Sequence, residues 1–409
     1  MGVVWCVPRA GWLKPVSERR LSDLVSVGLL TQVFPPELVD EVIAEAGRTE
    51  QRHRSLPARV MAYFAVGMAL HSEGSYEDVL GLLTDGLSWA GSAAGPVKLP
   101  SKSAIFQARD RLGFEPVKAL FDRVARPLAT AATPGSFLAG RRLVAIDGTT
   151  LDVADTVVND EYFGRPGVSK GEKSAFPQAR LVALAECGTH AIFDAEIGAY
   201  ATSELALSRV LADRLGPGMV LLADRGFTGF ALWQQAAATG ADLLWRAKNN
   251  VHPRQIEVFD DGSWLGEMRL NNTRLNSEAI VVRVVEYSID DGRGTQAGPF
   301  RLFTTLLDPS EVTATELAAA YAQRWEIESV FDELKTHQRG SKMVLRSKSP
   351  ALVLQEIWGH LCCHYAIRTL MFAAAHDADI DPDRVSFVAA LRITRRSLSQ
   401  ARGFSPSGH

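Results

Sequence analysis

Three carboxylates have the side-chain type and the setting that metal-dependent phosphodiester chemistry requires. Asp147 follows the apolar run 143–146, and Asp224 follows the apolar run 219–223. Carboxylates at the carboxyl ends of neighbouring strands lie at one edge of a sheet, where ligands usually bind. Glu328 lies further along, within a stretch that has helical spacing. Because a lone aspartate after a strand is often only a turn former, the combination and not any single residue predicts a site.

The predicted helix around Glu328 has a polar stripe beside an apolar face. At about 100° per residue, the side chains of Tyr321, Arg324, Glu328 and Lys335 fall within roughly 60° of one another. An adjoining face is apolar and would pack on a sheet. Arg324 and Glu328 are also an i,i+4 pair, so a salt-bridged surface helix accounts for the same pattern. The two aspartates favour a site over that alternative.

Neighbouring carboxylates compete for these roles. Asp152 and Asp155 come shortly after Asp147, and three further acids flank Glu328, namely Glu326, Asp332 and Glu333. We predict Asp147 as the ligand because it directly follows the apolar run.

The chemistry that three such acids support is phosphoryl transfer. Two divalent ions about 3.5–4 Å apart activate the nucleophile and relieve charge on the leaving oxygen. Hard cations prefer carboxylate oxygens, so we expect Mg²⁺, with Mn²⁺ as a substitute, held by Asp147, Asp224 and Glu328. The sequence has no His/Cys cluster with zinc-site spacing. Arg324 and Lys335 could hold phosphates that flank the scissile bond.

The elements that would position these residues indicate a mixed α/β core. Three strands, a helix, a strand, a helix and a strand follow one another between residues 143 and 246, a pattern typical of the ribonuclease H-like fold. The expected elements after the first strand are Arg180–Glu186, His190–Ile197, Glu204–Leu215, Met219–Ala223, 229–238 and Asp242–Arg246. A single helix is expected from about Thr313 to His337, with Thr313 or Thr315 as its N-cap.

The remaining segments predict a domain organisation around that core. We assign residues 1–140 to a helical N-terminal domain, 141–249 and 308–345 to the catalytic core, 250–307 to a β-rich insertion and 346–409 to C-terminal helices. Helix 101–112 carries Gln107, Arg109 and Arg111 and could read DNA in a helix-turn-helix. A solvated face of a helical bundle accounts for it equally well.

Composition and net charge exclude few classes of function. The net charge of −3 argues mildly against nucleic-acid binding, but the chain from Lys335 onward has 11 Lys and Arg against 5 Asp and Glu. No apolar run reaches the roughly 18 residues that span a bilayer, and no secretion signal is evident. The four cysteines form no CxxC pair, and we expect buried free thiols in a reducing cytoplasm.

The motifs resemble those of insertion-sequence transposases of the insertion element four family. Tyr321, Arg324, Glu328 and Lys335 match the Y-x2-R-x3-E-x6-K helix of that family at all four positions. Segments 147–150 and 223–227 resemble the motifs around its first and second aspartates, and a β-rich insertion before the glutamate is also a family feature. The resemblance covers nearly the whole chain.

This resemblance implies a bacterial, nucleoid-associated enzyme that acts as a homodimer on the double-stranded DNA of its element's terminal inverted repeats and of its target. It implies cut-and-paste transposition through a hairpin on the transposon end. The equivalents of Tyr321, Arg324 and Lys335 hold DNA, an aromatic residue for which Trp264 is our candidate stacks on a flipped base, and Arg225 could contact phosphate. A catalytically silent repressor and a non-mobile ribonuclease H-like nuclease remain alternatives.

Overall fold

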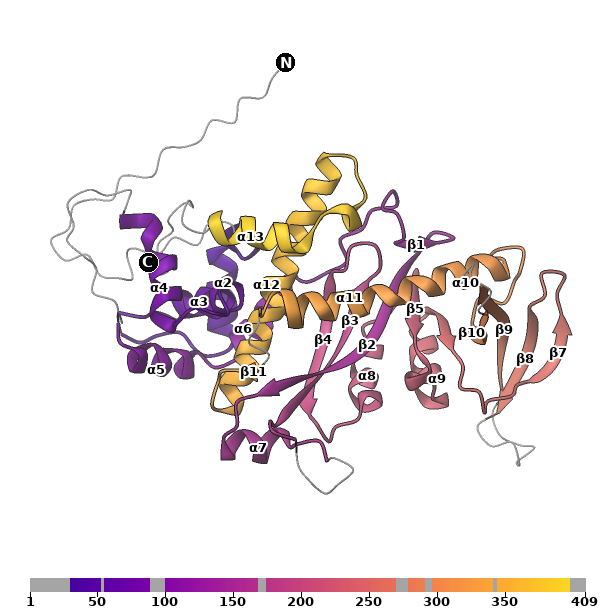
Figure 1. The fold of residues 1–409 in the computed structure, drawn as a ribbon, viewed down its shortest axis with the longest axis horizontal. Coiled ribbons are helices and arrows are strands. Elements are labelled where there is room, and N and C mark those ends of the chain that lie inside the picture. Colours follow the sequence, from indigo (N-terminus) through magenta and orange to yellow (C-terminus); the bar gives the residue numbers. More distant parts are fainter. Residues whose placement is uncertain are drawn as a thin grey trace, which may run out of the picture. The chain divides into compact units, whose positions relative to one another are not determined.

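The computed structural model describes residues 30–52, 55–88, 100–167, 174–269, 279–290, 296–340 and 344–397. The chain falls into two compact units, of which the first comprises 1–124, 334–370 and 386–409 and the second comprises 125–333 and 371–385 (Figure 1). No helix among the described residues is long and apolar enough to cross a membrane.

The first unit is built from helices. They are α1 (Leu30–Val33), α2 (Pro36–Glu45), α3 (Ala58–Leu70), α4 (Tyr76–Ser88), α5 (Lys102–Leu112), α6 (Glu115–Val124), α12 (Pro350–Asp377) and α13 (Phe387–Ser397), with the two-residue strand β11 (Val344–Leu345). Only the part of α12 up to Leu370 belongs to this unit. Every residue of α3 is buried, so it forms the centre of the bundle. Ser101 caps α5, and Gly113, at a φ of 72°, ends it after residue 112, where the predicted helix also ends.

The second unit contains one mixed sheet. Its strands are β1 (Phe137–Leu138), β2 (Arg141–Val153), β3 (Gln178–Glu186), β4 (Ile192–Ala199), β5 (Met219–Ala223), β6 (Asp242–Arg246), β7 (Arg254–Val258), β8 (Trp264–Arg269), β9 (Ala279–Asp290) and β10 (Gln296–Thr304). Their order is β4-β3-β2-β5-β6-β10-β9-β8-β7, with β1 beside β2. β2, β5 and β6 are parallel and the other pairs are antiparallel. The order and directions of β4, β3, β2, β5 and β6 confirm the predicted ribonuclease H-like α/β core.

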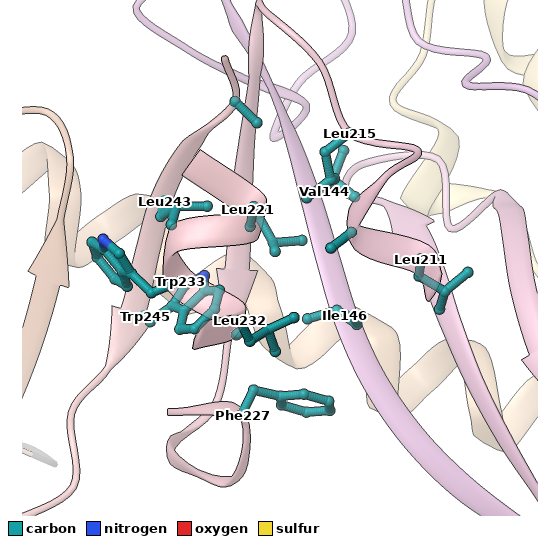
Figure 2. Close-up of a cluster of buried hydrophobic side chains, with 14 of the residues drawn as sticks. Val144, Ile146, Leu211, Leu215, Leu221, Phe227, Leu232, Trp233, Leu243 and Trp245 are labelled. Atoms are coloured by element: carbon teal, nitrogen blue, oxygen red, sulfur yellow. The ribbon is translucent and has the colours of Figure 1, made fainter. Parts of the chain in front are cut away.

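One face of this sheet is covered by α8 (Glu204–Ala212) and α9 (Phe230–Ala238). Buried side chains of β2, β3, β5 and β6 form a continuous apolar core with those of the two helices (Figure 2). Trp233 and Trp245 meet edge to face within it, with ring centroids 5.1 Å apart. The apolar runs that predict β5 and β6 are therefore the sheet side of this core.

The stretch that carries Tyr321, Arg324 and Glu328 lies near the other face of the sheet. It is not the single uniform helix that the sequence predicts. It comprises α10 (Ala314–Ala322), a 3₁₀ turn (Gln323–Trp325), α11 (Glu326–Asp332) and a π-helical turn (Glu333–His337). The predicted N-cap is confirmed, because Thr313 and Glu316 form a capping box. Asp261 also accepts a hydrogen bond from Ala314 N–H and pairs with the fully buried Arg283 on β9. These bonds fix where α10 begins.

β2 continues well beyond the predicted apolar run. It spans 13 residues, and β3 pairs with it as far as Asp152. β5 stops at Ala223, opposite Ile146, so the rest of β2 does not have β5 as a neighbour and needs no continuous apolar sequence. A short helix, α7 (Val157–Phe163), follows β2 and was not predicted.

The four strands of the 250–307 segment extend the main sheet, because β10 pairs with β6. The segment is β-rich as predicted. That this segment is a separate domain remains a prediction. The other predicted domain boundaries also remain predictions.

Candidate active site

The two aspartates follow residues that are paired across neighbouring parallel strands. Ile146 on β2 lies opposite Ala223 on β5, and Asp147 and Asp224 come next. Asp147 thus lies inside β2, not at its end, and marks the point where β5 stops alongside it. Its carboxylate accepts a hydrogen bond of 2.7 Å from Gly148 N–H, and Asp224 accepts one of 2.7 Å from Gly226 N–H. Each carboxylate is therefore oriented by its own backbone.

Arg324 joins the third carboxylate to this pair. α11 packs against β2 (Figure 1). Arg324 Nη2 donates to Glu328 Oε1 at 3.0 Å, while Nη1 lies 3.7 Å from Asp147 Oδ2. The guanidinium group is buried, whereas the Glu328 side chain is 48% exposed. Arg324 Nε is buried and has no hydrogen-bond partner among the described residues, so a donor remains for a ligand.

Tyr321 connects the helical stretch to the end of β5. Its hydroxyl donates to the carbonyl oxygen of Ala223, the residue before Asp224, at 3.3 Å. Burial raises the pKa of the Tyr321 hydroxyl well above its ordinary range, with Asp224 adding to the effect. The phenol therefore stays protonated and acts as a hydrogen-bond donor near the second aspartate.

Asp147 is in an environment that disfavours its charge. Burial raises its pKa to about 6, and the negative charges of Asp224 and Glu204 act in the same direction, against the Gly148 N–H and Arg324. Repulsion between close carboxylates is relieved when a cation binds between them. The donor set consists of carboxylate oxygens, which suits a hard divalent ion such as Mg²⁺ or Mn²⁺. The residues present therefore fit the predicted metal.

The competing acids have other partners. Asp152 accepts a hydrogen bond from Gln178, and Asp155 pairs with Arg165. Glu326 accepts a hydrogen bond from Gly188 N–H in the turn after β3. These contacts support the choice of Asp147 and Glu328 over their neighbours.

The remaining predicted contacts are spread over other elements. Arg225 is exposed in a 3₁₀ turn (Arg225–Phe227) directly after Asp224. Trp264 is half-buried on β8, where it packs on the core and lies against the Cα of Gly266. Lys335 lies in the π-helical turn and belongs to the other compact unit. Within the second unit, the structure thus brings together the three acids, Tyr321 and Arg324, with Arg225 next to Asp224 in the chain, whereas Trp264 lies on the insertion strand β8.

Two cations that we did not predict lie at the carboxyl end of β6, the neighbour of β5. Arg246 stacks on the Phe300 ring at 4.6 Å, and Lys248 Nζ lies 3.4 Å from the carbonyl oxygen of Thr228. Arg246 also acts electrostatically on Tyr321. The sequence could have indicated these two cations, because both closely follow the apolar run of the third parallel strand.

The interpretation of helix 101–112 as a DNA reader needs one correction. Arg109 is fully buried. It donates to Tyr76, Gln355 and Ser347 inside the first unit. Its guanidinium group therefore holds helices together and does not face DNA, whereas Gln107 and Arg111 are exposed.

Comparisons with known proteins identify the relatives of this chain. Residues 24–122 match the family described as insertion element 4 transposase N-terminal, and residues 138–366 match the transposase DDE domain. The transposase InsG of insertion sequence element IS4 from Escherichia coli strain K12 is 29% identical over 389 residues, which cover 94% of this chain and 85% of InsG. The putative transposase InsZ of the same strain is 27% identical over 259 residues, 63% of this chain and 84% of its own.

A solved structure is also similar. A piggyBac transposase in a synaptic complex with hairpin DNA superposes with a TM-score of 0.44 at 12% identity, over 91% of this chain and 79% of the other.

Proposed function

We propose residue roles for this protein on the premise that the chain belongs to the DDE transposase family, whose members cleave DNA and transfer its strands. Within that family we infer that it acts on the terminal inverted repeats of its own insertion sequence. The observation that carries the proposal is the placement of Asp147 and Asp224 after paired residues of adjacent parallel strands, with Glu328 joined to Asp147 through Arg324.

Asp147, Asp224 and Glu328 would hold the divalent metal, which we infer to be two Mg²⁺ ions with Mn²⁺ as a substitute. When bound, the ions activate the attacking hydroxyl and offset the charge on the leaving oxygen. Arg324, whose buried Nε has no hydrogen-bond partner among the described residues, would donate to a phosphate. Tyr321 keeps its proton and orients the end of β5, which carries Asp224.

Basic side chains around the acids would hold the DNA backbone. Arg225 is exposed beside Asp224, and Arg246 and Lys248 lie at the end of the neighbouring strand. Phosphate contacts fix the register of a duplex without reading its sequence. We also keep Lys335 as a phosphate contact and Trp264 as the candidate for stacking on a flipped base. Trp264 would have to leave its packed position to do so.

We infer the course of the reaction from the family resemblance. A first cut leaves a 3′-hydroxyl, and attack of that hydroxyl on the opposite strand closes a hairpin on the transposon end. The same site then opens the hairpin and joins the end to target DNA. We propose a homodimer on DNA, because two transposon ends must be cut and joined together, in the cytoplasm and nucleoid of a bacterium.

The test uses the duplex that flanks this gene, with its inverted repeat labelled at the 5′ end. Mg²⁺- or Mn²⁺-dependent nicking is expected from the unaltered protein and should be lost in Asp147→Asn, Asp224→Asn and Glu328→Gln while DNA binding survives. Asp152→Asn, on the same strand as Asp147, is the matched control and should still cut. A snap-back product on a denaturing gel would support the hairpin route.

Two results would contradict the proposal. Binding of the end without cutting at any metal concentration would make the protein a repressor. Cutting of DNA without preference for the inverted repeat would favour a non-mobile nuclease.

A further inference from the structure

A second group of metal-ligand side chains lies in the same unit, outside the carboxylate site. It consists of His190 in the turn after β3, Glu326 at the start of α11 and Asp383 in a 3₁₀ turn (Pro382–Arg384). One ligand atom from each lies within 4.8 Å of the others. The sequence could not reveal this group, because its members come from three distant segments.

The distances match a shared cation better than direct hydrogen bonds. His190 Nε2 lies 3.7 Å from Glu326 Oε2 and 3.4 Å from Asp383 Oδ1. Nitrogen–oxygen hydrogen bonds are about 2.7–3.2 Å long, so both separations are too great. Ligand atoms about 2.05 Å from a tetrahedral Zn²⁺ ion lie about 3.3 Å from one another. The two carboxylate oxygens therefore lie from the imidazole nitrogen at nearly the spacing that one ion would impose, and all three atoms lie within 4.8 Å of one another.

The other nitrogen of the imidazole faces a carboxylate. His190 Nδ1 lies 3.5 Å from Glu333 Oε1. A histidine that binds metal commonly presents its second nitrogen to a carboxylate, which fixes the ring and makes it a stronger ligand. Glu326 Oε2 in turn accepts a hydrogen bond from Gly188 N–H, which orients the ligand oxygen. Glu326 thus has its supporting hydrogen bond in place, and Glu333 lies beside the second nitrogen of the imidazole.

The charge balance points the same way. Three carboxylates face a single imidazole, whose side chain is 11% exposed. The charges that act on Glu326 are those of His190, Asp383 and Asp381, of which two are negative. Partly buried carboxylates repel one another unless a cation compensates them.

We propose that His190, Glu326 and Asp383 bind one divalent transition-metal ion of the Zn²⁺ class, with Glu333 supporting the histidine. Imidazole nitrogen favours Zn²⁺ over Mg²⁺, which distinguishes this site from the all-carboxylate site. The ion clamps the first turn of α11 to the turn after β3 and to segment 381–383. Glu328 lies two residues after Glu326, so the clamp positions the third carboxylate. The binding itself does not depend on the proposed function.

The test is Zn²⁺ binding by the full-length, metal-free protein in excess Mg²⁺. To remove binding at the carboxylate site, the background variant is Asp147→Asn with Asp224→Asn. We expect one Zn²⁺ per chain, a higher Tm with Zn²⁺ and the X-ray absorption signature of one imidazole ligand. Glu333→Gln should weaken Zn²⁺ binding about 10- to 100-fold, as loss of a supporting carboxylate does.

His190→Asn and Asp383→Asn should abolish the Zn²⁺-dependent rise in Tm. His190 has a φ of 57°, and asparagine tolerates this conformation, so the turn should be kept. Asp383 is exposed, so its variant tests the site even if His190→Asn fails to fold. His252→Asn, at an exposed histidine in the same unit, is the control and should leave binding unchanged. Zn²⁺ binding that lacks an imidazole signature, or that survives Asp383→Asn, would overturn the proposal, as would no binding.

If Zn²⁺ does not bind at the His190 group, the transposase proposal is unaffected. That proposal depends on DNA cleavage by Asp147, Asp224 and Glu328. If the unaltered protein binds Zn²⁺ but does not cleave DNA, the transposase proposal fails and the Zn²⁺ site stands.

Discussion

Replacing Asp147 with asparagine should stabilise the metal-free protein at neutral pH. Burial, with the charges of Asp224 and Glu204, raises the pKa of Asp147 to about 6 from an ordinary value of 3.8. A pKa that is higher by one corresponds to about 1.36 kcal/mol, so ionising this carboxyl in the folded protein costs about 3 kcal/mol. Asparagine keeps the oxygen that accepts the Gly148 N–H and carries no charge. The variant therefore removes the penalty and keeps the local hydrogen bond.

The effect has a defined pH dependence. Between about pH 4 and pH 6 the unfolded chain has lost the Asp147 proton while the folded chain retains it. The free energy of unfolding therefore falls as pH rises through this window, and the penalty is complete above the folded pKa. By this linkage, Asp147→Asn should stabilise the protein by about 1.5 kcal/mol at pH 5 and by about 3 kcal/mol at pH 7.5.

The measurement is urea unfolding in EDTA, followed by hydrogen exchange of peptides from β2 and β5, since only the second unit should respond. Asp260→Asn, at an exposed carboxylate, is the control and should change stability by less than about 0.5 kcal/mol. Adding Mg²⁺ should stabilise the unaltered protein and leave Asp147→Asn almost unchanged. A variant that is less stable than the unaltered protein at pH 7.5, or equally stabilised at pH 5 and 7.5, would refute the reasoning.

Three other variants test single contacts. Lys248→Gln should weaken DNA binding and reduce the magnitude of its salt slope by about one, measured by titration at several salt concentrations; an unchanged slope would exclude a phosphate contact. Arg109→Met should lower the stability of the first unit by about 3–5 kcal/mol in thermal unfolding, because it leaves buried partners unsatisfied; normal stability with weak DNA binding would restore the DNA-reading interpretation. Glu186→Gln should destabilise the second unit by about 2–4 kcal/mol in urea unfolding, because Glu186 pairs with Arg142 and accepts the N–H groups of Leu128 and Ala129; a change under about 1 kcal/mol would contradict this.

Strands whose side chains are buried on both faces were predictable from sequence. β5 and β6 have the predicted bounds, because a short apolar run flanked by turn residues is typical of a buried strand. The outer half of β2 was missed for the opposite reason. Thr149, Thr150 and Asp152 are polar and alternate with the buried Leu151 and Val153, so that part of the strand has no continuous apolar run, and it pairs with β3.

The helix α7 shows where periodicity fails. Val157, Val158 and Tyr162 are exposed, and of the large apolar residues of this helix only Phe163 is buried. Local polar contacts also hold it, namely the Thr156 cap and the ion pair between Arg165 and Asp160. A pattern that assumes buried apolar residues cannot predict such a helix.

Part of the candidate site was predictable because Tyr321, Arg324 and Glu328 recur at helical spacing in the sequence. The His190 group has no such pattern. Residues two apart on a helix point about 200° away from each other, so Glu326 and Glu328 leave α11 in nearly opposite directions. Glu328 meets Arg324, and Glu326 meets the turn after β3. Any contact that fixes the direction of Glu326 also fixes the rotation of the helix, and therefore the direction of Glu328. Glu328, which belongs to the motif, is thus held in place by Glu326, which does not.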